Sequence, residues 1–126
     1  KVCVTQEDIR GLQLAKAAFA AGMRILLQDS HTPYEQLDHV VLAGGFGSYL
    51  KKESAAAIGL IPKELLPITE SVGNAAGEGA VSAAISQKAR EQLLTIRKSM
   101  HYIELSTHPD FSQEYMDQMD FDESKR

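Results

Sequence analysis

Apolar residues recur every three or four positions in the first part of the chain. These positions are Ile9, Leu12, Ala15, Phe19, Met23 and Leu26. Such spacing places the side chains on one face of a helix. Thr5 supplies a hydroxyl that can cap the first turn, and Glu7 and Asp8 favour the positive end of a helix dipole. The pattern therefore predicts a long helix that begins after Thr5.

Gln13 and Lys16 lie three positions apart on this predicted helix and project from the same side. A Gln and a Lys so placed either face solvent or line a binding site. The spacing alone favours a solvated face.

A short β-rich apolar run over His39–Ala43 ends in three glycines, Gly44, Gly45 and Gly47. Glycine at the carboxyl end of a buried strand removes Cβ, permits positive φ and lets backbone amides approach a ligand closely. A nucleotide is the first ligand to consider. A tight turn without a ligand fits the same glycines, and both interpretations stay open because short motifs often match by chance.

The patterns that follow predict alternating helices and strands. The expected elements are a helical turn over Tyr34–Asp38, a short helix over Glu53–Ile58 closed by Gly59, a strand over Ile68–Val72, a helix of small residues over Asn74–Ile85 capped by Asn74, and a helix after Ser86 that reaches Met100. This order predicts an open α/β layer with a right-handed crossover. The small residues indicate either close packing or clearance for a ligand.

The last part of the chain predicts an edge strand over His101–Leu105 and a short amphipathic helix that starts near Pro109. This terminal helix is acidic outside, and it either packs on its own domain, which is favoured, or docks on a partner. We expect residues 122–126 to form a disordered acidic tail.

Composition limits the class of protein. The chain has 126 residues, 44% hydrophobic and 24% charged, which fits one globular domain at most. A net charge of −4 without a basic patch argues against nucleic acid, and no apolar run is long enough to span a bilayer. The lack of a signal peptide favours the cytoplasm. The chain starts within a β-branched run and without Met, so we expect it to be a fragment.

Familiar catalytic and metal-binding patterns are missing from the sequence. There is no P-loop, and a dinucleotide fingerprint fails at Leu50, where the third glycine should stand. The lone Cys3 and the scattered histidines supply no metal or cluster site. The sequence therefore indicates no catalytic residue and no metal ligand.

Taken together, several segments resemble the carboxyl-terminal part of the ATP-dependent reductive activators of corrinoid proteins, the RACo/RamA type. This family belongs to the acetate and sugar kinase, heat-shock cognate and actin (ASKHA) superfamily. The segments that carry the resemblance are Asp8-Ile9-Arg10, Gln13-Leu14-Ala15-Lys16, Val41-Leu42-Ala43-Gly44-Gly45-Phe46-Gly47, Ile58-Gly59-Leu60-Ile61-Pro62, Gly73-Asn74-Ala75-Ala76-Gly77-Glu78-Gly79-Ala80 and Tyr102-Ile103-Glu104-Leu105-Ser106.

The resemblance implies an α/β fold, with an RNase H-like ASKHA subdomain over residues 1–121. Its sheet would be partial and open, with helices on its flanks. The subdomain would be incomplete without an upstream lobe. It implies that Gly44, Gly45, Phe46 and Gly47 pass beside an adenosine, and that Gln13 and Lys16 reach its ribose and adenine. For the small-residue helix, close packing remains the favoured interpretation.

The resemblance also implies cofactors and partners. ATP or ADP with Mg²⁺ would bind between two lobes, with the Mg²⁺-binding acids in the missing lobe. An iron–sulfur cluster, bound by upstream cysteines, would reduce a corrinoid protein by electron transfer. The fragment alone should not hydrolyse ATP. A non-catalytic module for homodimerisation or docking is the alternative, and a small dinucleotide-binding fragment is a third, weaker one.

Overall fold

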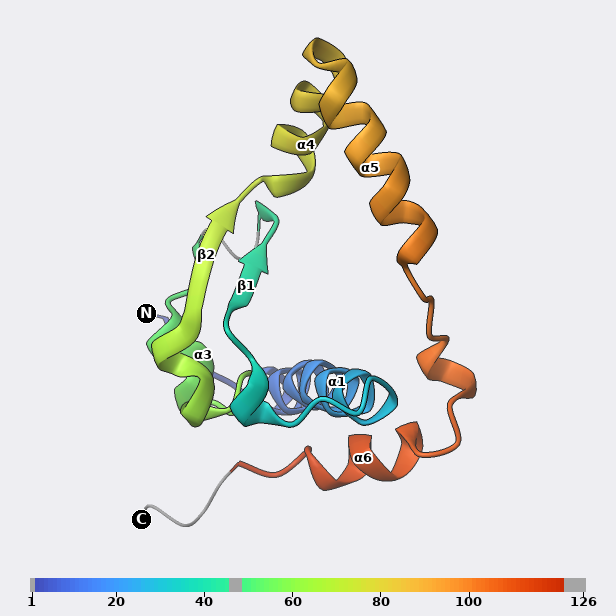
Figure 1. Ribbon diagram of the computed structural model, residues 1–126. Helices are drawn as coiled ribbons and strands as arrows, with labels where there is room; N and C mark the ends of the chain where they lie inside the picture. Colours follow the sequence, from blue (N-terminus) through green and yellow to red (C-terminus); the bar gives the residue numbers. More distant parts are fainter. Residues whose placement is uncertain (1, 46–48, 122–126) are drawn as a thin grey trace.

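The computed structural model describes residues 2–45 and 49–121 (Figure 1). Its longest element is α1, Gln6–Asp29, which begins where the sequence predicts. The Thr5 hydroxyl accepts a hydrogen bond from the Asp8 amide at 3.2 Å, and the Asp8 carboxylate accepts one from the Thr5 amide at 2.8 Å. This reciprocal capping box satisfies two backbone amides that the helix itself leaves without partners.

Two parallel strands form the sheet. Strand β1, Val40–Ala43, pairs with β2, Thr69–Gly73, in a register that places Val40 opposite Thr69 and Ala43 opposite Gly73. The register is irregular after Leu42, so that Val72 is passed over. The connection contains α3, Lys52–Ala57, and the 3-10 helix η2, Lys63–Ile68. The predicted order of strand, helix, strand and helix is therefore confirmed.

Small side chains dominate the buried part of the fold. Ala17, Ala20, Ala21 and Ile25 of α1 are buried, as are Ala55 and Ala56 of α3 and Ile61 and Leu65 next to it. Ala55, Ala56 and Ile61 form a cluster against which Met23 and Leu42 pack. Alanines let α1, α3 and the sheet approach closely. Of the described residues, Ile25 is the largest side chain to be fully buried.

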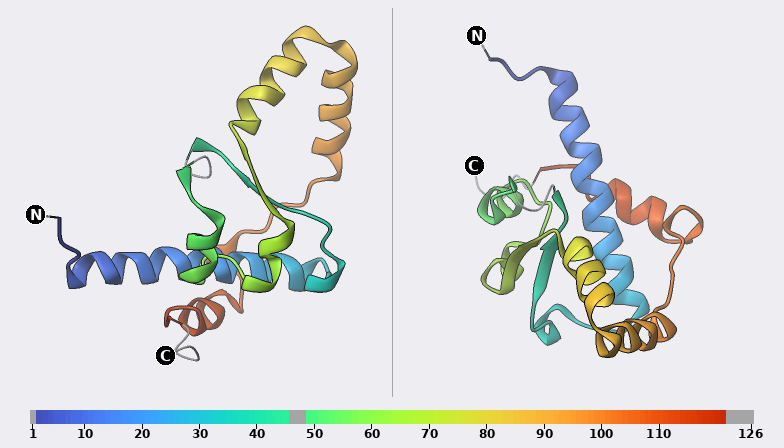
Figure 2. Two further views of the ribbon diagram at one scale, coloured as in Figure 1. Left: turned by 90° about the vertical axis from the view of Figure 1, so that its left-hand side faces the viewer. Right: turned by 90° about the horizontal axis from the view of Figure 1, so that it is seen from above.

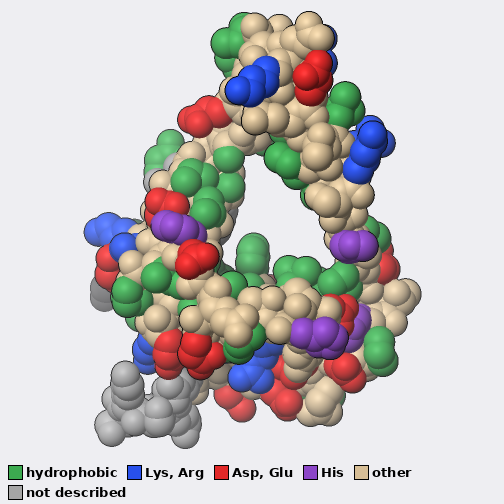
Figure 3. All heavy atoms as spheres, viewed as in Figure 1, with side chains coloured by type: hydrophobic (Ala, Val, Ile, Leu, Met, Phe, Trp, Pro, Cys, Tyr) green, Lys and Arg blue, Asp and Glu red, His purple; other side chains and the backbone are tan. Residues whose placement is uncertain are grey.

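Helices α4, Ala75–Ile85, and α5, Gln87–Ser99, form a hairpin that projects from the carboxyl end of β2 (Figures 1 and 2). Asn74 and Ser86 cap them, as the sequence predicts. The Arg90 guanidinium donates two hydrogen bonds to the Ala83 carbonyl, and these stabilise the turn between the two helices. Neither helix contains a buried residue. In the space-filling view an opening lies between the hairpin, the sheet and α1, with apolar side chains along its border (Figure 3).

The chain then returns to α1. The 3-10 helix η3, Leu105–Thr107, leads into α6, Phe111–Asp117, which lies beside α1 (Figures 1 and 2). The terminal helix therefore packs on its own domain, as favoured above, and the helical turn expected before the first strand is the 3-10 helix η1, Tyr34–Gln36. The predicted tail, residues 122–126, lies outside the described residues.

The edge strand predicted over His101–Leu105 is wrong. These residues form an irregular link that ends in η3. The link spans the distance between α5 and α6, on the opposite side of the opening from the sheet, so within the described part of the chain no strand lies beside it to pair with (Figure 1). The residues of the link favour a strand, but no described strand lies beside them with which their backbone could pair.

Candidate functional site

Two glycine turns lie side by side at the carboxyl edge of the parallel sheet. The Gly44 amide donates a hydrogen bond to the Gly73 carbonyl at 2.7 Å. Gly44 has φ of +97° and Gly73 has φ of +65°, a conformation that residues with a Cβ rarely adopt. In α/β folds, ligands bind at this edge of the sheet. The geometry thus places the predicted glycine turn where a ligand site is expected.

The turn presents bare backbone. Among the residues that the structure describes, a Cβ built on Gly45 meets no atom within 4 Å, and neither does one built on Gly44. Packing within the described residues therefore does not require glycine at either position. The positive φ of Gly44, however, does favour glycine there. Phe46 and Gly47, the other two predicted residues of this turn, lie outside the described residues.

Gln13 and Lys16 lie on the same helix but in different environments. Gln13 is half-buried, whereas the Lys16 side chain is nearly enclosed, with 3% of its surface exposed. The expectation of a solvated face is therefore wrong for Lys16. It fails because elements distant in sequence, the turn after α3 and the C-terminal segment, close over the helix at this point.

The Lys16 ammonium is held by contacts from both of those elements. Nζ donates a hydrogen bond to the Asp120 carbonyl and lies 5.2 Å from the centre of the Phe121 ring. A Cβ built on Gly59 would come within 3.5 Å of the same nitrogen. A backbone carbonyl and an aromatic face are both favourable neighbours for a buried cation. Sequence patterns gave no signal for Asp120 or Phe121, because neither is near Lys16 along the chain.

A cavity of about 790 Å³ opens beside Lys16. Its lining comes from α1, η1, the segment from α3 to η2 and the C-terminal segment, and it includes Arg24, Tyr34, Leu65 and Phe121. Gly44, Gly45 and Gln13 do not line it. The glycine turn at the sheet edge and the enclosed Lys16 on α1 are therefore two separate features of the structure. Strand β1 runs away from α1 toward the glycine turn (Figure 2).

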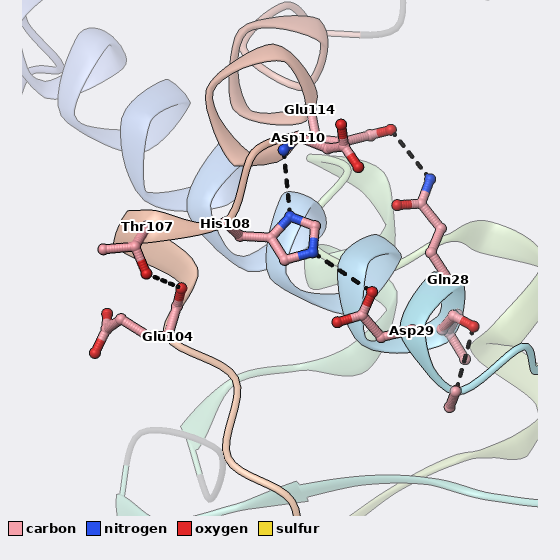
Figure 4. A network of polar contacts seen from close by, with 9 residues as sticks. Gln28, Asp29, Glu104, Thr107, His108, Asp110 and Glu114 are labelled. Atoms are coloured by element: carbon pink, nitrogen blue, oxygen red, sulfur yellow. Dashed lines mark hydrogen bonds and ion pairs between the residues drawn. The ribbon is translucent and has the colours of Figure 1, made fainter.

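Polar side chains attach the C-terminal part of the chain to the end of α1 (Figure 4). Glu114 of α6 pairs with Arg24 at 3.3 Å and accepts a hydrogen bond from Gln28 at 3.5 Å. Burial disfavours the Arg24 charge, but the hydrogen bond and attraction of Glu114, with a further contribution from Tyr34, raise the pKa of Arg24. The Nε2 atom of His108 lies 3.4 Å from a carboxylate oxygen of Asp29. These contacts hold α6 in place and do not resemble a catalytic arrangement.

Within the ranges that the structure describes, no group of three or more His, Cys, Asp or Glu side chains could hold a metal ion. Among the same residues, no helix combines the length and apolar character needed to cross a membrane. Cys3 is exposed.

Comparison with known proteins gives a match over the whole chain. A family model described as the C-terminal domain of RACo, the ASKHA domain, matches residues 1–126. The chain belongs to this family. The expected family and its α/β ASKHA fold are thereby confirmed.

Two relatives agree with this assignment. The corrinoid activation enzyme RamQ of Eubacterium limosum is 38% identical over 116 residues, which are 91% of this chain and 19% of that protein. A solved structure of a reductive activator for corrinoid, iron–sulfur protein superposes with a TM-score of 0.82 at 39% identity, over 92% of this chain and 18% of that one. This RACo C-terminal domain thus spans about a fifth of the length of the relatives it matches.

Proposed function

We propose that this domain forms the nucleoside-binding side of an ATP-dependent reductive activator whose client is a corrinoid protein. The observation that carries the proposal is the bare turn at Gly44 and Gly45, paired with Gly73 at the carboxyl edge of the sheet, in a chain of the RACo family. The names of the two relatives support the choice of client.

The chain's own residues fit an adenosine at this edge. No atom of residues 2–45 or 49–121 occupies the Cβ position of Gly45, so a flat base or ribose could lie against the backbone there, where a side chain would stand in the way. In the proposal, Gly44, Gly45, Phe46 and Gly47 form this surface. Gln13 and Lys16 would contribute polar contacts from α1, although they and the glycine turn do not line one cavity in this structure.

The remaining chemistry is assigned to parts of the protein outside this chain. ATP or ADP would bring Mg²⁺, whose acidic ligands belong to the other lobe in this proposal. The iron–sulfur cluster would be bound there too, since Cys3 is the single cysteine in the chain. The domain would act as a gate, because closure of the lobes around ATP changes the shape of the activator only if the closed form binds ATP more tightly.

Calorimetric titration of ATP and ADP into the complete polypeptide tests the proposal. The Gly45→Val variant should lose nucleotide binding and still unfold cooperatively, because a Cβ at this position meets no atom of the described residues within 4 Å. Gly11→Ala is a matched control, since a Cβ there also meets open space but on α1, away from the turn. Unchanged affinity in Gly45→Val would refute the nucleotide site.

A second candidate function is homodimerisation through the α4–α5 hairpin. The hairpin exposes large apolar side chains, among them Ile85 at 82% and Met100, just after α5, at 71%. Exposed apolar side chains gathered on one element are typical of an interaction site. Light scattering on the complete polypeptide should then give the mass of a dimer, and the Ile85→Glu variant should give that of a monomer. A monomeric unaltered protein would exclude this function.

A further inference from the structure

We propose that the segment Gln118–Phe121 is a strap that competes with nucleotide for Lys16. The proposal rests on the function proposed above, in which Lys16 contacts the nucleotide. Its structural basis is the pair of contacts that Asp120 and Phe121 make with the Lys16 ammonium.

The strap reaches Lys16 from far along the chain. Asp120 and Lys16 are separated by 104 positions, yet the Asp120 carbonyl accepts a hydrogen bond from Nζ. The Phe121 ring adds a cation–π contact, with Nζ 5.2 Å from the ring centre. Gly59 also lies close to Nζ, and the Lys16 side chain is only 3% exposed. The ammonium is therefore covered while the strap is in place.

The last two residues of the strap, Asp120 and Phe121, can move independently of α6. Helix α6 ends at Asp117 and is attached to α1 by the ion pair of Glu114 with Arg24 and by the contact of His108 with Asp29. The amides of Gln118 and Met119 still donate hydrogen bonds to the Glu114 and Met116 carbonyls of α6, whereas the contacts of Asp120 and Phe121 are with Lys16. Asp120 and Phe121 can therefore leave Lys16 while α6 stays on α1.

The Lys16 side chain is only 3% exposed, and the Asp120 carbonyl and the Phe121 ring are among the groups that cover its ammonium. A ribose hydroxyl or a phosphate that contacts Nζ therefore has to take the place of these groups. Nucleotide binding then releases the strap, and releasing the strap strengthens nucleotide binding by the same factor, because coupling between two sites is reciprocal. The strap thus weakens nucleotide binding until it is displaced.

The Phe121→Ala variant of the complete polypeptide tests the competition. Loss of the cation–π contact should tighten ATP binding by roughly threefold to thirtyfold in calorimetry. Phe121→Leu should give a similar gain, since leucine keeps the apolar bulk but offers no aromatic face. Tyr102→Ala is the control, because Tyr102 is an exposed aromatic residue that donates its hydrogen bond to Glu104. It should leave the affinity unchanged.

A second measurement uses the unaltered protein. ATP should accelerate amide hydrogen exchange at Met119–Phe121 and leave exchange in α6 unchanged. Weaker or equal affinity in Phe121→Ala, or exchange at Met119–Phe121 that ATP does not change, would overturn the competition. If the unaltered complete protein binds no nucleotide, the proposed function fails. If it binds nucleotide and ignores the strap variants, only the competition fails.

Discussion

His108 bridges α1 and α6 through both nitrogens of its ring. Nδ1 accepts a hydrogen bond from the Asp110 amide at 3.3 Å, and Nε2 lies 3.4 Å from the Asp29 carboxylate (Figure 4). Only 13% of the His108 side chain is exposed. The imidazole therefore joins the start of α6 to the end of α1, and it helps to determine where the C-terminal segment lies.

Replacing His108 by alanine should destabilise the attachment of α6. Loss of the two polar contacts should lower the free energy of unfolding by about 1–2 kcal/mol. Chemical denaturation of the complete polypeptide measures the change, and hydrogen exchange should locate it in α6. His101→Ala, at an exposed histidine, is the control and should have little effect. Equal effects of the two variants would contradict this role.

Two glycines of α4 should respond in opposite ways to replacement by alanine. A Cβ on Gly77 would lie 2.4 Å from Nδ2 of Asn74, the side chain that caps this helix, whereas a Cβ on Gly79 meets no atom of the described residues within 4 Å. Gly77→Ala should therefore lower the unfolding midpoint. Gly79→Ala should stabilise α4 by up to about 1 kcal/mol, since alanine favours helix. If Gly79→Ala is destabilising, another part of the protein packs against Gly79.

The capping box of α1 predicts a dependence of stability on pH. Hydrogen bonds from the Thr5 hydroxyl and amide lower the pKa of Asp8 below its ordinary value of 3.8. A carboxylate with a lowered pKa stabilises the folded state above the ordinary value and loses this contribution as the pH falls through the lowered one. Asp8→Asn should therefore reduce thermal stability at neutral pH, and the difference from the unaltered protein should shrink in acid. A difference that stays constant from neutral to acidic pH would contradict this origin.

Ile25 should be the most sensitive apolar position of α1. Its side chain is fully buried, and alanine there would leave a cavity in a region built mostly from small residues. Ile25→Ala should cost about 2–5 kcal/mol and Ile25→Val about 0.5–1.5 kcal/mol. Denaturant titration of both variants in the complete polypeptide checks the ratio. Similar small losses would mean that the site collapses around the smaller side chain.

Contacts between residues three or four apart could be predicted from the sequence. The caps at Thr5, Asn74 and Ser86 are hydrogen bonds to amides three positions later, so the start of each helix is encoded locally. The strand before Gly44 follows from its apolar run in the same way. The resemblance of several segments to the RACo family was also visible in the sequence, and the family match confirms it.

The role of Gly77 shows where local patterns mislead. Small residues in α4 favoured close packing, but Gly77 is needed because its own cap, Asn74, occupies the space of a Cβ. The β-rich composition of His101–Leu105 likewise predicted a strand that has no neighbouring strand to pair with.

The sequence by itself determined the helices, the two strands, the glycine turn and the family. Tertiary structure alone decided that Lys16 is enclosed, that Gly44 pairs with Gly73 and that α6 lies on α1. The physical reason is the separation along the sequence between the residues that interact. A cap or an apolar stripe depends on neighbours within one helical turn, whereas the environment of Lys16 depends on a carbonyl 104 positions away, which only the folded chain brings to it.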